Sequence, residues 1–193
     1  MAVVLGLGNP GARYARTRHN VGWRVVETLV GRWKARPAEA VPEIQAWEAT
    51  LPSRTVALLW ALSYMNESGR ALSAWRERHP LELSELLVVA DDVYLPLGMV
   101  RLRAGGSSGG HRGLASLEEA LGSRDYARLR IGVGEAPAET LREHVLEEFR
   151  EEEEAAANEA ILKAADAVEC WAGEGLLAAM NRFNRRVQQE EKP

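Results

Sequence analysis

Cysteine is nearly absent from this chain, since Cys170 is the only one among 193 residues. A single thiol excludes an intramolecular disulfide, a cysteine-rich zinc site and a C-x-x-C redox pair. There is also no run of about 18 apolar residues that could cross a bilayer, and the first residues show no basic segment leading to a cleavage site. We therefore expect a cytosolic protein that does not enter a membrane.

Lysine is scarce as well, because arginine supplies 21 of the 24 basic residues. The net charge of -4 taken alone argues against a nucleic-acid partner. The charge is unevenly divided, however: residues 1–134 hold 17 basic and 13 acidic residues, a net of +4, whereas residues 135–193 hold 7 and 15, a net of -8. Arginine suits bidentate contacts with phosphate, although a coding bias toward arginine and alanine explains its abundance equally well.

Short apolar runs alternate with helical patterns along the chain. Strands are expected at residues 3–7, 44–50, 55–62, 86–90, 99–103 and 127–133, and helices at residues 21–33, 65–75, 114–121 and in three stretches that reach residue 184. This alternation predicts one α/β domain, with a mixed, mostly parallel, twisted sheet covered by helices. We expect the domain to span residues 1–186 and the polar residues 187–193 to be a frayed tail.

A first glycine motif follows the first predicted strand, because residues 6–11 read G-L-G-N-P-G and match G-x-G-x-x-G. That pattern is typical of dinucleotide-binding folds when its third glycine opens a helix. Here the helical period starts only at Val21, and Pro10 has no backbone N–H to offer to a phosphate. The glycines are therefore predicted to open a loop.

A second motif, G-S-S-G-G at residues 106–110, matches the G-x-S-x-G of serine hydrolases and would make Ser108 a nucleophile. Such an enzyme needs an acid and then a histidine later in the chain, and beyond the glycine loop only His144 follows, in an acidic helical stretch. A flexible glycine-rich loop is the better interpretation. His111 is expected at most to orient this loop.

The connection at residues 9–20 concentrates polar chemistry, with Tyr14, three arginines and His19 between a strand and a helix. A lone histidine near a helix start usually has no chemical role. Asp91, however, directly follows the apolar strand at residues 86–90, and the carboxyl ends of parallel neighbouring strands meet at one rim. A His-Asp pair at such a rim can activate water, because the carboxylate stabilises the imidazolium that forms.

Several motifs together resemble one family. The stretch V-L-G-L-G-N-P-G at residues 4–11, followed by Tyr14, T-R-H-N at residues 17–20 and Gly22, is similar to the N-terminal signature of the bacterial-type peptidyl-tRNA hydrolases. Further matches are Y-M-N at 64–66, D-D at 91–92, the glycine loop at 105–114, R-L-R-I-G-V-G at 128–134 and M-N-R-F-N at 180–184. The resemblance covers about residues 2–185.

The resemblance implies hydrolysis of the ester between a peptide and tRNA, without a metal or other cofactor. The expected partner is peptidyl-tRNA, through its acceptor stem and 3′ end, and a monomer is expected. By this resemblance His19 is the general base that activates water, and Asp91 stabilises the protonated histidine. Asn9 and Asn66 would hold the peptide and ester groups through their amides, with Asn9 helping to separate blocked from free aminoacyl-tRNA.

Tyr14 and Tyr64 line the same cleft by the resemblance, and their rings can stack on a terminal base. One position departs from the family pattern, because Arg112 follows the histidine of the glycine loop where the family usually has asparagine. An arginine can donate to a phosphate or ribose of the tRNA but cannot accept a hydrogen bond. Ser107 and Ser108 make the loop polar, and we expect a mobile lid there.

Phosphate binding is expected from two pairs of alternating arginines, in which each pair points one way from its strand: Arg101, Arg103, Arg128 and Arg130. The alternative is that these are solvated charges at a sheet edge. Six basic against three acidic residues in the segment 99–134 favour RNA. Two rival functions remain, namely an RNA-binding protein that has lost catalysis and an esterase of broad specificity.

Overall fold

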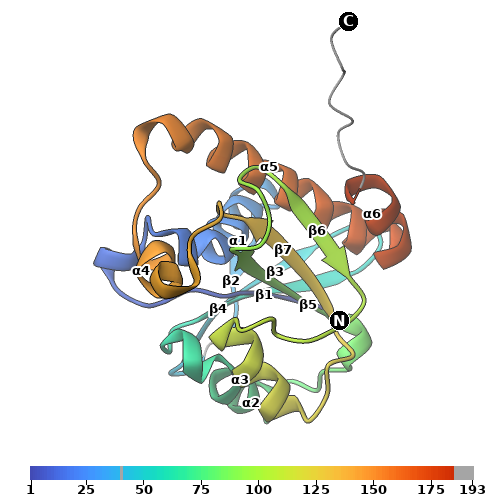
Figure 1. The fold of residues 1–193 in the computed structure, drawn as a ribbon. Helices are drawn as coiled ribbons and strands as arrows, with labels where there is room; N and C mark the ends of the chain where they lie inside the picture. The colour runs from blue at the N-terminus through green and yellow to red at the C-terminus, as the bar shows by residue number, and fades with distance from the viewer. Residues whose placement is uncertain (40, 185–193) are drawn as a thin grey trace, which may run out of the picture.

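The computed structural model describes residues 1–39 and 41–184 (Figure 1). The strands are β1 (Ala2–Gly6), β2 (Arg36–Pro37), β3 (Ile44–Thr50), β4 (Thr55–Ala61), β5 (Leu86–Asp92), β6 (Val100–Arg103) and β7 (Ala127–Gly132). The helices are α1 (Val21–Arg32), α2 (Ser68–Arg76), α3 (Arg112–Leu121), α4 (Leu141–Leu146), α5 (Glu151–Glu174) and α6 (Leu176–Phe183). The predicted elements are thus confirmed, whereas the tail expected at residues 187–193 lies outside the described part.

The strands form one sheet in the order β2-β3-β4-β1-β5-β7-β6. β1 pairs in parallel with β4 and with β5, and β5 pairs in parallel with β7. β3 is antiparallel to β2 and β4, and β6 is antiparallel to β7. Because most strands run in one direction, the mixed, mostly parallel sheet of the prediction is confirmed. β7 is an inner strand and β6 lies at the edge.

Helices cover both faces of the sheet (Figure 1). One face packs against α1, α5 and α6, and the other against α2 and α3. Strand side chains alternate between faces, so Val4 and Val89 enter the first core and Leu5 and Val88 the second. All five residues of β1 are buried. No helix in the described residues has the length and apolar character needed to cross a membrane.

The loop after β1 contains two short 3-10 turns, Ala12–Tyr14 and Arg18–Asn20, and α1 begins only after them. The first glycine motif therefore opens a loop, as predicted, and its third glycine does not begin a helix. The helix expected from residue 65 also starts as a 3-10 turn, Met65–Glu67, before α2. Each of these turns brings polar residues to the carboxyl ends of β1 and β4.

Glycine allows α1 to lie directly on the strands. A Cβ atom on Gly22 would lie 2.5 Å from the carbonyl oxygen of Val89 and 2.6 Å from that of Leu7. On the strand side, a Cβ atom on Gly6 would lie 2.5 Å from the carbonyl oxygen of Gly22. The start of α1 is therefore in backbone contact with β1 and β5, and this contact places the preceding turn beside the end of β5.

We predict that Gly22→Ala lowers the free energy of unfolding by about 3 kcal/mol, because the added methyl group overlaps backbone atoms that cannot move aside. Gly31→Ala in the same helix is the matched control, since its Cβ atom meets nothing within 4 Å. It should raise the free energy of unfolding by up to about 1 kcal/mol. Urea unfolding of both variants measures the difference, and equal effects would show that the helix approach is not constrained.

Candidate active site

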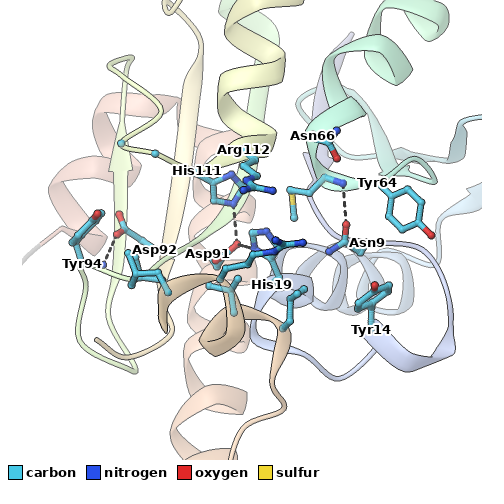
Figure 2. Close-up of a pocket in the computed structure, with 18 of the residues that line it drawn as sticks. Asn9, Tyr14, His19, Tyr64, Asn66, Asp91, Asp92, Tyr94, His111 and Arg112 are labelled. Atoms are coloured by element: carbon cyan, nitrogen blue, oxygen red, sulfur yellow. Dashed lines mark hydrogen bonds and ion pairs between the residues drawn. The ribbon is translucent and has the colours of Figure 1, made fainter. Parts of the chain in front are cut away.

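A cavity of about 550 Å³ opens at the carboxyl ends of the parallel strands. It lies between the loops that follow β1, β4 and β5, the glycine loop before α3, and helix α4. Figure 2 shows its polar side chains converging from these segments. Eight of the site residues predicted from the sequence line this cavity: Asn9, Tyr14, His19, Tyr64, Asn66, Asp91, Arg112 and Arg130.

His19 and Asp91 form a hydrogen-bonded pair at this rim (Figure 2). The Nδ1 atom of His19 lies 2.7 Å from Oδ1 of Asp91. His19 comes from the turn before α1 and Asp91 from the end of β5, which is a parallel neighbour of β1. The two residues meet as expected from the sequence, and since a carboxylate only accepts, the Nδ1–H of His19 donates.

A second histidine contacts the same carboxylate oxygen, because Nε2 of His111 lies 2.9 Å from Oδ1 of Asp91. Its Nδ1 atom accepts hydrogen bonds from the backbone N–H groups of Gly113, at 3.1 Å, and Leu114, at 3.2 Å. His111 is thus the N-cap of α3. Since Nδ1 accepts, the proton is on Nε2 and is donated to Asp91, and of the two imidazoles only His19 keeps a free ring nitrogen.

This role of His111 was missed from the sequence, which suggested only that it orients the glycine loop. The available signal was its position shortly before the helix predicted at residues 114–121, where a side-chain acceptor can cap the first turn. The contact with Asp91 could not be read in the same way, because it depends on how α3 returns to the end of β5.

Asp91 is 2 % exposed, and burial alone would raise the pKa of its carboxyl. The two histidines outweigh burial through their electrostatic attraction and their hydrogen bonds to the carboxylate, and hold the pKa of Asp91 well below its ordinary value. The carboxylate therefore stays ionised at any pH near neutrality.

His19, Asp91 and His111 are also the residues whose donor atoms could suit a metal ion, since these atoms lie within 4.8 Å of one another. Oδ1 of Asp91 already accepts hydrogen bonds from both rings, at 2.7 and 2.9 Å. A metal bound to this oxygen would compete with both hydrogen bonds. The cluster is accounted for as a hydrogen-bonded unit.

The amide of Asn9 is held in a fixed orientation. Its Oδ1 accepts the backbone N–H of Met65 at 2.9 Å, which leaves the NH₂ group to serve the cavity. Its backbone is held on both sides by the fully buried Asn20, whose Oδ1 accepts the N–H of Asn9 at 2.9 Å and whose Nδ2 donates to its carbonyl at 3.0 Å. Asn20 belongs to the T-R-H-N motif, but the sequence did not reveal this contact.

Aromatic residues stand at opposite ends of the cavity (Figure 2). Tyr14 and Tyr64 lie near Asn9, and the guanidinium of Arg13 lies 4.5 Å from the ring centre of Tyr14. Tyr94 stands at the other end and is 66 % exposed. It was not predicted, nor was the apolar wall that α4 contributes through Leu141, Val145 and Leu146.

The expectation that Arg128 binds phosphate is wrong. Arg128 is 1 % exposed, and its guanidinium donates to Glu118 at 3.3 Å and to the carbonyl of Ser107 at 3.2 Å. It also stacks on Tyr126, with its central carbon 4.4 Å from the ring centre. The reason is topological, because β7 lies between β5 and β6 and its side chains on the α3 face are covered.

Arg130 is also engaged within the protein. Its guanidinium contacts Asp92 at 3.3 Å and donates to the carbonyls of Ser107 and Ser108 at 2.9 Å each. Together with Arg128 it fastens the glycine loop that the sequence predicts to be mobile. Arg130 therefore lines the cavity mainly as the anchor of this loop.

Arg101 and Arg103 remain available on edge strand β6, directly opposite Arg130 and Arg128 and on the same face of the sheet. The side chains of these four arginines therefore leave the sheet on the same face, as two directly opposed cross-strand pairs. In the described residues, the arginines with no carboxylate within 4.0 Å are Arg13, Arg36, Arg76, Arg101, Arg103, Arg112 and Arg142. Most of these line the cavity or lie on β6.

Comparisons with known proteins agree with one another. The family model described as peptidyl-tRNA hydrolase matches residues 3–192. The peptidyl-tRNA hydrolases of Syntrophomonas wolfei and Desulforudis audaxviator are 44 % and 46 % identical over 184 residues, which cover 95 % of this chain and 100 % and 93 % of those proteins. A crystal structure of peptidyl-tRNA hydrolase from Acinetobacter baumannii is 30 % identical, with a TM-score of 0.88 over 95 % of this chain and 94 % of that one.

Proposed function

The chain belongs to the peptidyl-tRNA hydrolase family and hydrolyses peptidyl-tRNA, and we propose that His19 is the general base of this reaction. The assignment of His19 as the base rests on one observation. Asp91 accepts from Nδ1 of His19 and so leaves Nε2 of that ring free to take a proton in the cavity. His111 binds the same carboxylate, but both of its nitrogens are occupied.

In the proposed mechanism, Nε2 of His19 accepts a proton from water as the water oxygen attacks the carbonyl carbon of the ester. Asp91 stabilises the imidazolium through its contact at 2.7 Å. When the tetrahedral intermediate collapses, the bond to the ribose oxygen breaks and the imidazolium returns its proton to that oxygen. The products are a peptide with a free carboxyl group and a tRNA with a free ribose hydroxyl.

Asn9 and Asn66 are proposed to hold the acyl part of the substrate. Because Oδ1 of Asn9 is occupied by Met65, Asn9 presents only donors to the cavity. Donors suit the carbonyl oxygen of a peptide bond and disfavour the ammonium group of a free aminoacyl-tRNA. This gives Asn9 a physical basis for selecting blocked substrates. Tyr14 and Tyr64 offer aromatic faces beside it.

The tRNA is proposed to contact Arg101, Arg103 and Arg112, which have no acidic partner in the described residues. The acidic first turn of α5, Glu151–Glu154, belongs to a helix on the opposite face of the sheet from the β6 arginines. The β6 arginines and this acidic turn are therefore separated by the sheet. We propose further that the enzyme acts as a monomer in the cytoplasm, where its substrate arises in translation.

Two rival assignments differ in measurable activities. A binding protein without catalysis would retain tRNA but cleave nothing, and a broad esterase would cleave simple aryl esters as readily as peptidyl-tRNA. The intact His19–Asp91 pair and the oriented amide of Asn9 favour neither rival. Rates with peptidyl-tRNA, free aminoacyl-tRNA and an aryl ester separate all three assignments, and only the first substrate should turn over efficiently.

We predict that His19→Ala lowers the single-turnover rate of peptidyl-tRNA cleavage by about a thousandfold, since it removes the group that accepts the proton of water. Binding of tRNA, measured by filter retention, should be nearly unchanged. His79→Ala is the control, because His79 stacks on Trp75 at 4.4 Å, far in the fold from the carboxyl-end cavity. Full turnover by His19→Ala would exclude the mechanism.

The phosphate contacts should be visible in the salt dependence of tRNA binding. We predict that Arg103→Gln or Arg101→Gln reduces the slope of log K against log salt by about 0.7 to 0.9 for each phosphate that the variant no longer binds. Arg36→Gln is the matched control, an exposed arginine on β2 at the other edge of the sheet. Equal slopes for all variants and the parent protein would reduce the β6 arginines to ordinary surface charge.

A further inference from the structure

We propose that His111 is a positioning residue that weakens proton binding at His19 by taking part of the charge of Asp91. The inference rests on the proposed role of His19 as general base. It goes beyond that role because it assigns the second histidine a function of its own, namely setting the pH below which the enzyme loses activity.

The geometry requires His111 to be neutral. Its Nδ1 accepts two backbone N–H groups, at 3.1 and 3.2 Å, and a proton on that nitrogen would face both of them. The ring also sits at the N-terminus of α3, where the helix dipole disfavours a cation. His111 therefore keeps a single proton, on Nε2, and this proton is directed at Oδ1 of Asp91.

The shared oxygen makes the two histidines compete. A carboxylate that faced His19 alone would stabilise its imidazolium with its full charge. Here Oδ1 of Asp91 also receives the hydrogen bond from His111, at 2.9 Å beside 2.7 Å for His19. Part of the accepting capacity of the carboxylate is thus already used, and the imidazolium of His19 gains less from it.

Other charged groups near the rings do not replace this effect. Asp92, the other carboxylate lining the cavity, is bound to Arg130 at 3.3 Å. Arg18, next to His19, is paired with Glu153 at 2.7 Å, and His144 on α4 contacts the carbonyls of Val133 and Gly134. The remaining arginines that line the cavity are Arg13, Arg112 and Arg142, and their charges act in the same direction as His111.

Replacement of His111 by asparagine separates its two contacts. Asparagine is a favoured N-cap residue and can still accept from the first turn of α3, but it is too short to donate to Asp91. We expect the acid limb of kcat/KM to move to higher pH by about one unit in His111→Asn, while the rate at high pH falls only a few-fold.

His79→Asn provides the control. It should leave the acid limb and the rate at high pH unchanged, because His79 stacks on Trp75 of α2 and does not line the cavity. An acid limb that does not move in His111→Asn would overturn the inference and leave His111 a purely structural cap. So would ring nitrogen signals of His111 in the parent protein that titrate between pH 5 and 9, a measurement that does not depend on any variant folding.

The His19→Ala variant keeps this inference distinct from the proposed function. Full turnover by His19→Ala would make the proposed function fail, whatever His111→Asn does. If His19→Ala is inactive and the acid limb of His111→Asn does not move, only the present inference fails. The chain has only 4 histidines, so the ring signals of His111 can be assigned by single substitution.

Discussion

One carboxylate oxygen organises the catalytic end of this molecule. Oδ1 of Asp91 receives hydrogen bonds from His19, in the turn before α1, and from His111, at the start of α3. The first contact orients His19, the proposed base, and the second joins it to the start of α3 and the glycine loop. Because Asp91 is buried and held ionised by these partners, its loss would leave both rings without their common acceptor.

Backbone pairing and backbone packing bring these residues together. β1 and β5 are parallel neighbours, so the loop after one strand and the last residues of the other reach the same rim. The close contact of Gly22 with the carbonyls of Leu7 and Val89 holds α1 against both strands. His19, three residues earlier, is thereby fixed beside Asp91. Asn20, the next residue, hydrogen-bonds the backbone of Asn9. The amide oxygen of Asn9 is occupied by Met65, so its amide presents only donors to the cavity.

Contacts between residues at the ends of neighbouring parallel strands could be predicted from the sequence. Asp91 lies at the end of β5 and His19 in the connection that follows β1, and parallel pairing was enough to predict that they meet. Arg128 was misassigned because alternation along β7 shows that a side chain leaves the sheet but not that α3 and the glycine loop cover it. His111 was underrated for a related reason, since its contact with Asp91 depends on the packing of a helix that no local pattern locates.

The central claim is that Asp91 sets both the orientation and the protonation of His19. The pH dependence of kcat/KM for Asp91→Asn tests this claim directly. The pair predicts a rate at high pH that falls roughly a thousandfold, because the imidazolium loses its partner and the ring its fixed tautomer. It also predicts an acid limb that moves to lower pH, since the ring binds its proton less tightly without the carboxylate. An unchanged rate and an unmoved acid limb would contradict the arrangement and assign the orienting group elsewhere.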